Sequence, residues 1–288
     1  MLDQMLIGRY EIQKQLGKNS GRQTVLAIDH QTQELVVIKL LTFNEDFEWQ
    51  SLKLFEREAE VLKSLDHPAI PRYLNYFEIE RGFALVQSYI NARSLEEHVQ
   101  AGRTFKEFSV KQIAIDILEI LTYLHSRLPP VIHRDIKPSN ILLTEQTEYS
   151  SAKVYLIDFG SVQTAVNIPQ GTITIVGTYG YMPMEQFGGQ TVPASDIYSL
   201  GATLIYLVTG RHPTELPQDD GRIAYEQIVS LSPALANWLQ LMTEPSLKRR
   251  LKSAKVALDV LEQVKKSRLV SQWEGEGREK VLRWYIHE

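Results

Sequence analysis

Cysteine is absent from the 288 residues of this chain, and its absence excludes several kinds of site at once. Without thiols the protein forms no disulfide, no thiolate zinc site and no cysteine nucleophile. A chain that lacks disulfides is compatible with a reducing compartment, and we therefore expect a cytoplasmic protein.

Long apolar runs are missing as well. A membrane helix needs about 20 consecutive apolar residues, whereas the most apolar stretch, residues 200–208, is far shorter. Residues 1–9 lack the charged segment followed by an apolar segment that marks a secretory signal. We expect neither a membrane span nor a signal peptide.

Positive charge is in slight deficit, because 31 Lys and Arg face 35 Asp and Glu, a formal net charge of −4. This mild acidity argues against a protein built chiefly to bind nucleic acid. The chain is 43% hydrophobic, which is enough for a sizeable core and too apolar for a disordered protein. Its length corresponds to about two domains.

The first part of the chain has the pattern of strands with one helix. Short aliphatic and β-branched runs, separated by turn-forming residues, predict strands at 10–16, 24–29, 35–41, 73–79 and 83–88. Apolar residues at helical spacing predict one helix after the third strand, with members Leu52, Phe55, Ala59, Leu62 and Leu65.

The character becomes helical after residue 94. Ser109 and Gln112 have the spacing of a capping box and predict a helix that begins there. A hairpin is predicted from 141–143 and 154–157, and helices resume from about 196 to 264. We predict an α+β protein of two lobes, a β-rich lobe at 1–90 and a helical lobe at 91–264, followed by a C-terminal extension at 265–288 of unknown role.

Four separated motifs carry chemistry. A lysine ends the strand-like run Val36-Val37-Ile38-Lys39, and Glu58 lies on the predicted helix after it. Residues 133–140 read His-Arg-Asp-Ile-Lys-Pro-Ser-Asn, and residues 158–160 read Asp-Phe-Gly. In this order the motifs resemble those of the eukaryotic-type protein kinase superfamily, and in particular bacterial eukaryotic-like Ser/Thr protein kinases. The resemblance covers about residues 8–264.

The resemblance implies a protein kinase-like fold and an enzyme that transfers the γ-phosphoryl group of Mg-ATP to a Ser or Thr hydroxyl of a protein. Lys39 would hold the α- and β-phosphates, and Glu58 would fix the direction of Lys39. Asn140 and Asp158 would hold Mg²⁺, which prefers hard oxygen ligands.

The catalytic pair implied by the resemblance is Asp135 and Lys137. Asp135 would accept the proton of the acceptor hydroxyl, and Lys137 would contact the transferring phosphate, as in Ser/Thr kinases rather than tyrosine kinases. His133 is expected to be a buried structural residue with no part in proton transfer.

An adenine pocket follows from the same resemblance. Gln87 takes the gatekeeper position, backbone groups of Ser88 and Ile90 would meet the adenine edge, and Val37 and Leu142 would sandwich the ring. Ordinary core aliphatic residues would give the same sequence pattern, and that alternative stays open.

The phosphate-binding loop departs from the family pattern of three glycines. Only Gly17 falls in place, whereas Asn19 and Arg22 occupy the other two glycine positions. Arg22 either supplies a charge near the nucleotide, obstructs the loop or points to solvent. This irregular loop motivates the alternative function, a nucleotide-binding pseudokinase that acts as a signalling scaffold.

Two further expectations concern the segment after Asp-Phe-Gly. Thr172 and Thr174 are candidate phosphosites whose phosphate could pair with Arg134, although they are also compatible with ordinary loop threonines. Thr178 is expected to bond near Asp135 and Lys137.

Residues 183–185 resemble the family's Ala-Pro-Glu motif in the Glu alone, and the resemblance implies that Glu185 pairs with a buried arginine, either Arg249 or Arg250. The expected partners are ATP and a protein substrate, with no nucleic acid, and the sequence leaves the oligomeric state and the substrate's identity open.

Overall fold

The computed structural model describes residues 5–19, 21–43, 47–145, 151–164 and 176–270. The chain divides into two compact units, residues 1–92 and residues 93–288, and each is described by itself.

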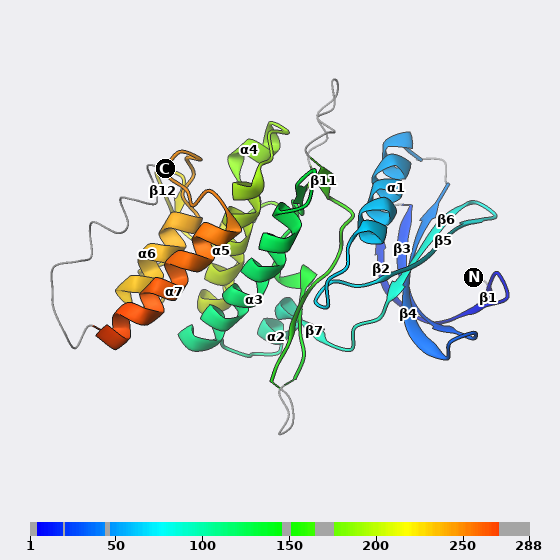
Figure 1. Cartoon of the computed structure of the whole chain (residues 1–288), viewed down its shortest axis with the longest axis horizontal. Helices are drawn as coiled ribbons and strands as arrows, with labels where there is room; N and C mark the ends of the chain where they lie inside the picture. Colours follow the sequence, from blue (N-terminus) through cyan, green and yellow to red (C-terminus); the bar gives the residue numbers. More distant parts are fainter. Residues whose placement is uncertain (1–4, 20, 44–46, 146–150, 165–175, 271–288) are drawn as a thin grey trace. The chain divides into compact units, whose positions relative to one another are not determined.

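The first unit is built on one antiparallel sheet of six strands in the order β1-β2-β3-β4-β6-β5 (Figure 1). Its elements are β1 (Met5–Leu6), β2 (Tyr10–Asn19), β3 (Arg22–Asp29), β4 (Glu34–Thr42), α1 (Trp49–Ser64), β5 (Tyr73–Ile79) and β6 (Gly82–Ser88). All five predicted strands and the predicted helix are present, and their ends differ from the predictions by a few residues at most.

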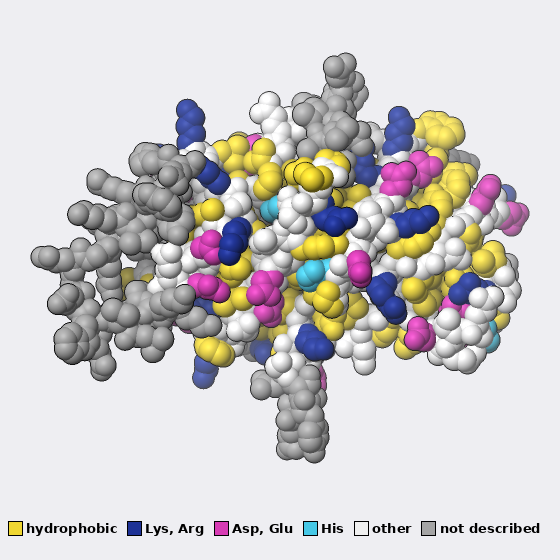
Figure 2. Space-filling view, in the orientation of Figure 1, with side chains coloured by type: hydrophobic (Ala, Val, Ile, Leu, Met, Phe, Trp, Pro, Cys, Tyr) yellow, Lys and Arg dark blue, Asp and Glu magenta, His cyan; other side chains and the backbone are white. Residues whose placement is uncertain are grey.

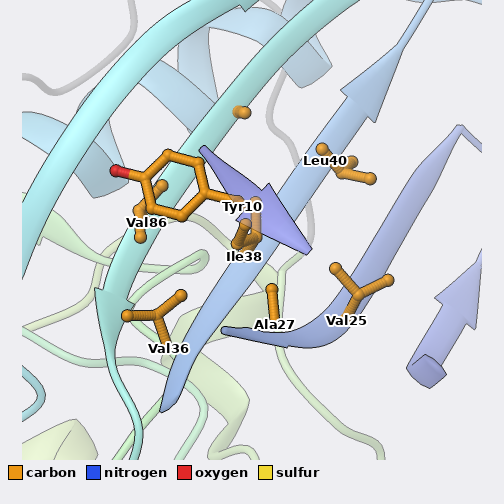
Figure 3. Close-up of a cluster of buried hydrophobic side chains, with 8 residues drawn as sticks. Tyr10, Val25, Ala27, Val36, Ile38, Leu40 and Val86 are labelled. Carbon is orange, nitrogen blue, oxygen red and sulfur yellow. The ribbon is translucent and has the colours of Figure 1, made fainter. Parts of the chain in front are cut away.

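Side chains along β4 alternate between the two faces of the sheet, and the two faces differ in burial. Val36, Ile38 and Leu40 are buried, whereas Val37 and Lys39 between them are only partly buried. The buried face forms a core, drawn in Figure 3, with members Tyr10, Val25, Ala27, Val36, Ile38, Leu40, Ala84 and Val86. The sheet is therefore anchored by one face of β4, and Val37 and Lys39 share the other face.

The second unit is mostly helical (Figure 1). Its helices are α2 (Leu95–Gln100), α3 (Glu107–His125), α4 (Met184–Phe187), α5 (Pro193–Thr209), α6 (Pro233–Met242) and α7 (Ala254–Val270). Two 3-10 turns, η1 (Pro138–Asn140) and η2 (Pro213–Glu215), complete the helical elements described. Helix α5 is buried along nearly its whole length and packs against α3, α6 and α7, which makes it the centre of this unit.

Short strands in the second unit form small antiparallel sheets that border the motif residues. The strands are β7 (Arg93–Ser94), β8 (Val131–Ile132), β9 (Ile141–Leu143), β10 (Val154–Leu156), β11 (Gln163–Thr164), β12 (Gln218–Asp219) and β13 (Arg222–Ile223). The pair β8–β11 borders the His-Arg-Asp motif, because β8 ends at Ile132. The pair β9–β10 forms the predicted hairpin and borders Asn140 on one side and Asp158 on the other.

The α+β class is confirmed, but the predicted capping box at Ser109 is wrong. Helix α3 begins at Glu107, after the cap residue Lys106, so Ser109 lies within its first turn. Hydrogen bonds from Lys111, at 2.5 Å, and from the Ser232 hydroxyl, at 2.6 Å, to the Glu107 carboxylate fix this helix end. One of these partners is 125 residues away in the sequence, and a local pattern cannot reveal it.

Two features of the described residues bear on partners. None of their helices has the length and apolar character that crossing a membrane requires. On the face drawn in Figure 2, the basic and acidic side chains that are described lie interspersed over the surface rather than gathered by sign.

Candidate active site

In the first unit, Lys39 and Glu58 form the ion pair that the motifs predict. Lys39 comes from β4, where it lies opposite Thr24 of β3 and Leu85 of β6, and Glu58 comes from α1. The Glu58 side chain is only 1% exposed. Because a buried carboxylate is stable only with a partner, the pair fixes both the rotation of α1 and the direction of the lysine.

The residues predicted for the adenine pocket in this unit lie along β4 and β6. Val37 pairs with Gln87 across the ladder, and Gln87 is buried. The Ser88 amide donates to the Arg72 carbonyl at 2.9 Å, so the backbone group of Ser88 that an adenine edge could meet is its carbonyl. Ile90 follows just after the end of β6 and is half-buried.

The hairpin of β2 and β3 contains the irregular phosphate loop. A Cβ added at Gly17 would meet no atom within 4 Å, so neither packing nor backbone conformation demands glycine there. Gly21 has a φ of +69°, and the turn itself therefore requires its glycine. The Asn19 side chain lies outside the described residues.

Arg22 has a partner that the sequence did not reveal. Its Nη2 donates to the Ser51 carbonyl at 3.0 Å, in the first turn of α1. The arginine thus connects the phosphate-loop hairpin to the helix that bears Glu58. No local pattern around Ser51 signals this contact, which joins residues 29 positions apart.

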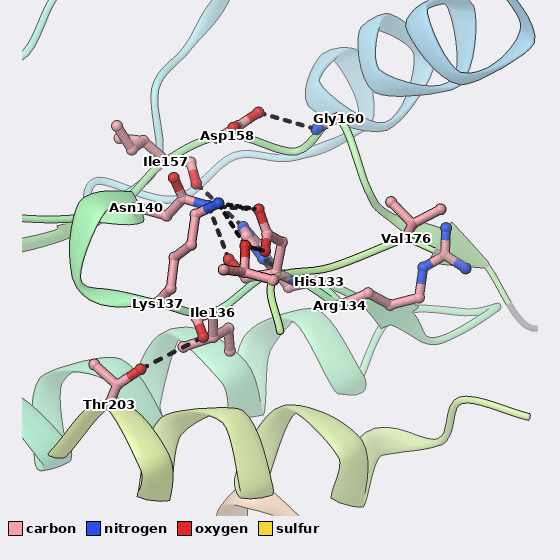
Figure 4. A network of polar contacts seen from close by, with 12 residues as sticks. His133, Arg134, Ile136, Lys137, Asn140, Ile157, Asp158, Gly160, Val176 and Thr203 are labelled. Carbon is pink, nitrogen blue, oxygen red and sulfur yellow. Dashed lines mark hydrogen bonds and ion pairs between the residues drawn. The ribbon is translucent and has the colours of Figure 1, made fainter. Parts of the chain in front are cut away.

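In the second unit, three side chains hold the Asp135 carboxylate, and Figure 4 labels two of them, Lys137 and Asn140. Oδ1 accepts from the Thr178 hydroxyl at 2.8 Å, and Oδ2 accepts from Asn140 Nδ2 at 3.0 Å and pairs with Lys137 Nζ at 3.0 Å. Lys137 also donates to Thr178 at 2.7 Å, which confirms the expected position of Thr178. A carboxylate has about four lone-pair directions, so one direction on Oδ1 is left for an acceptor hydroxyl.

Asn140 and Asp158 provide oxygens suited to a divalent cation. Asn140 Nδ2 donates to the Asp135 carbonyl and carboxylate, which leaves the amide Oδ1 to act as a ligand. Asp158 has a φ of +66°, a left-handed conformation that is strained for a residue with a Cβ. Among the described residues no group of three or more His, Asp or Glu could hold a metal ion.

Beneath the catalytic loop lies Asp196, for which the sequence analysis named no role. Its carboxylate is fully buried and accepts the backbone amides of His133 and Arg134 and the ring Nε2 of His125, each at 2.9 Å. Burial raises the pKa of Asp196, but the hydrogen bond from His125, the attraction of nearby histidine charge and the Arg134 amide together outweigh burial, and the pKa is lowered. The charged carboxylate therefore fixes the backbone immediately before Asp135.

His133 is buried, as expected for a structural residue. Its Nε2 lies 3.2 Å from the Ile157 carbonyl, and its ring meets the Phe159 ring edge-on at 4.9 Å between centroids. Burial lowers the pKa of His133, so the ring stays neutral at neutral pH. It connects the His-Arg-Asp and Asp-Phe-Gly motifs by packing.

The structure resolves the choice of arginine left open for Glu185. Arg250 Nη1 lies 2.6 Å from Glu185 Oε1, and the Arg250 side chain is 0% exposed. Arg249 instead pairs with Glu244 and is 63% exposed. Leu142, predicted for the adenine pocket, is the half-buried middle residue of β9. The candidate phosphosites Thr172 and Thr174 lie outside the described residues.

A lysine–glutamate pair on a β-rich unit, together with this Asp135 network on a helical unit, defines a protein kinase domain. A family model described as "Protein kinase domain" matches residues 10–271, and the chain belongs to that family.

The curated relatives include "Serine/threonine-protein kinase B" of Synechocystis sp., 39% identical over 274 residues, which cover 89% of this chain and 47% of that protein. "Serine/threonine-protein kinase PknA" of Nostoc sp. is 34% identical over 278 residues, covering 91% of this chain and 48% of the relative. "Serine/threonine-protein kinase PrkC" of Bacillus subtilis is 29% identical over 241 residues, covering 83% and 36%. The chain spans about half the length of the first two relatives.

Proposed function

We propose that this chain is a Ser/Thr protein kinase that transfers the γ-phosphoryl group of Mg-ATP to a Ser or Thr hydroxyl of a protein. The observation that carries the proposal is the Asp135 carboxylate, held by Thr178, Asn140 and Lys137 with one acceptor direction left on Oδ1. A carboxylate fixed in this way orients a hydroxyl for in-line attack and accepts its proton.

The nucleotide contacts are assigned residue by residue. Lys39, directed by Glu58, holds the α- and β-phosphates, and Gly17 belongs to the loop over the phosphates. The carbonyl of Ser88 and the amide of Ile90 meet the adenine edge, and Val37 and Leu142 pack against its two faces. These assignments rest on the family's motifs and on the partial exposure of Val37 and Leu142.

Asn140 Oδ1 and the Asp158 carboxylate would hold Mg²⁺, and their hard oxygens fit that ion. Bound Mg-ATP supplies the phosphoryl group, and the ion neutralises charge that develops on its oxygens. Asp135 takes the proton as the acceptor oxygen bonds to the γ-phosphorus and the bond to the bridging oxygen of the leaving ADP breaks. Lys137, which bonds both Asp135 and Thr178, stabilises the charge of the transferring group.

The choice of Ser or Thr rests on Lys137 and on the relatives' printed names. Lys137 lies two residues after Asp135, as in Ser/Thr kinases, and donates to the Thr178 hydroxyl that also bonds Asp135. The pseudokinase alternative has only the irregular glycine loop in its favour, because Lys39, Glu58, Asp135, Asn140 and Asp158 are all present.

We also propose a role in bacterial signalling, because the relatives named as Ser/Thr protein kinases include bacterial ones, and the substrate is a protein of unknown identity. We keep the division into residues 1–90, 91–264 and 265–288 as a proposal for the functional lobes. A cytoplasmic location stays a prediction from the cysteine-free composition.

The proposal is tested by incubating the purified chain with radiolabelled Mg-ATP and a mixture of generic protein acceptors. We expect label on protein, and acid hydrolysis should release phosphoserine or phosphothreonine without phosphotyrosine. Asp135→Asn should abolish labelling, whereas Asp219→Asn, an exposed control on β12, should leave it unchanged. Label on tyrosine, or labelling that survives Asp135→Asn, would contradict the proposal.

A further inference from the structure

Arg134, the residue before the catalytic aspartate, is held in an unusual conformation. It is a buried residue with a φ of +67°, in the left-handed region that residues with a Cβ rarely adopt. Such a conformation persists only where the surroundings over-determine it. The contacts around Arg134 therefore bear directly on where the Asp135 carboxylate lies.

One of these contacts is the side-chain amide of Gln163. Gln163 lies in β11 opposite Ile132 of β8, one residue before His133. Its Oε1 accepts from Arg134 Nη1 at 3.0 Å and from the Thr191 hydroxyl at 2.7 Å, and the residue is only 5% exposed. Arg134 Nε also donates to the Ser161 carbonyl. A neutral amide oxygen therefore accepts one of the N–H donors of the Arg134 guanidinium.

A second amide holds the backbone of the same residue. Gln186 Nε2 donates to the Arg134 carbonyl at 2.7 Å and to the Val176 carbonyl at 2.6 Å, and Gln186 is buried. Gly177 leaves the space for this side chain, because a Cβ there would lie 2.4 Å from Gln186 Nε2. Gln186 thus ties the end of the segment after Asp-Phe-Gly to the catalytic loop.

Resting on the proposed kinase function, we propose that Gln163 and Gln186 are positioning residues that hold Arg134, and through it Asp135, in the arrangement for phosphoryl transfer. Because both partners are uncharged amides of the chain itself, transfer does not require a phosphate on Thr172 or Thr174. A phosphate directed at Nη1 of Arg134 would have to displace Gln163 Oε1, which is also held by Thr191. This inference competes with the phosphate-ordering hypothesis from the sequence.

The variants are chosen to separate positioning from folding. Gln163→Met and Gln186→Met keep the side-chain length but lose the hydrogen bonds, and Gln163→Glu keeps an acceptor for Arg134 and Thr191. Gln240→Met is the matched control, since Gln240 makes its side-chain bond with Glu226 at an exposed position on α6. Thr172→Ala/Thr174→Ala cannot be phosphorylated at the two candidate sites.

The experiment measures kcat and KM for ATP with one protein acceptor, on full-length chains treated with phosphatase and shown by intact mass to be free of phosphate. We expect the wild type and Thr172→Ala/Thr174→Ala to retain at least half of the kcat of the untreated protein. Gln163→Met and Gln186→Met should lower kcat at least tenfold with KM for ATP within twofold, and Gln163→Glu should recover most of the loss. Gln240→Met should behave as the wild type.

Two results would overturn the inference. One is loss of most of the kcat on removing phosphate or on changing Thr172 and Thr174, and the other is an unchanged kcat in folded Gln163→Met. If Gln163→Met does not fold, the phosphate-free wild type and Gln163→Glu decide the matter. A failure of the proposed function differs from all of these, because then the untreated wild type would transfer no phosphate either.

Discussion

At the scale of single residues, strained backbone and chemical role coincide. Among the five described non-glycine residues with positive φ, Arg134 and Asp158 belong to the His-Arg-Asp and Asp-Phe-Gly motifs. Each such conformation costs about 1–3 kcal/mol, and buried contacts nearby offset that cost. For Arg134 those contacts include the hydrogen bonds that its backbone N–H donates to Asp196 and its Nη1 donates to Gln163, and the one that its carbonyl accepts from Gln186.

Arg22 leads to a prediction about the phosphate-loop hairpin. Arg22→Gly removes the bond to the Ser51 carbonyl, and we expect the free energy of unfolding to fall by about 0.5–1.5 kcal/mol beyond the effect of glycine itself. Lys18→Gly in the same hairpin, where the side chain is exposed, measures the glycine effect alone. Urea unfolding of both variants gives the comparison.

A third variant, Arg22→Lys, together with the KM of Arg22→Gly separates the contact with α1 from a contact with nucleotide. If Arg22 acts through α1, Arg22→Lys should restore part of the stability because its ammonium can still reach the carbonyl. A KM for ATP that rises in Arg22→Gly without any loss of stability would instead indicate that Arg22 contacts the nucleotide.

At the scale of elements, the ion pair of Arg9 and Asp29 joins the start of β2 to the end of β3. The Asp29 side chain is 4% exposed, and the two guanidinium bonds measure 2.8 and 2.6 Å. Hydrogen bonds from Arg9 lower the pKa of Asp29 from 3.8 to about 2. A lowered pKa stabilises the folded state above the unfolded value near 3.8, and this contribution is lost as the pH falls through about 2.

We therefore expect Asp29→Asn to lower the free energy of unfolding by about 2 kcal/mol at pH 7. The difference from the wild type should shrink between about pH 5 and pH 2, as followed by denaturant unfolding. Glu11→Gln, which breaks an exposed pair with His30, should change stability by less than about 1 kcal/mol. A difference for Asp29→Asn that is constant over this pH range would refute the linkage.

Sequence patterns predict the local elements of this fold but not the contacts between distant parts of the chain. Strand alternation and helical spacing are local, and they predict β5 at 73–79 with both ends correct. The motifs likewise predict the Lys39–Glu58 pair and the bonds of Thr178 to Asp135 and Lys137. Gln163, Gln186 and Asp196 carried no assigned role because their bonds to the catalytic loop join residues 29, 52 and 62 positions apart. Such contacts depend on tertiary packing, which no periodicity encodes.

At the scale of the whole molecule, the Glu185–Arg250 ion pair connects helix α4 to the chain just before α7. Besides Glu185, Arg250 donates to the carbonyls of Ala194, Glu244 and Pro245. We expect Arg250→Met to cost about 3–5 kcal/mol, because it leaves the Glu185 carboxylate buried without its charged partner. Arg249→Met should cost no more than about 1 kcal/mol, since Arg249 is 63% exposed and the Glu244 carboxylate keeps Arg222 as a charged partner.

Thermal and urea unfolding of the two arginine variants make a matched comparison of neighbouring residues. Equal losses of stability would show that burial of the Arg250 pair does not matter to the fold.

In the proposed function, Asp135 acts on the acceptor hydroxyl, whereas Asp158 would hold the metal with the nucleotide. The most direct test measures the affinity for Mg-ATP, by fluorescence of a bound ATP analogue, alongside the transfer rate for Asp135→Asn and Asp158→Asn. We expect Asp135→Asn to lower the rate at least 100-fold with the affinity within about threefold, and Asp158→Asn to lower the affinity and the rate together. Equal loss of Mg-ATP affinity in both variants would contradict this division of roles.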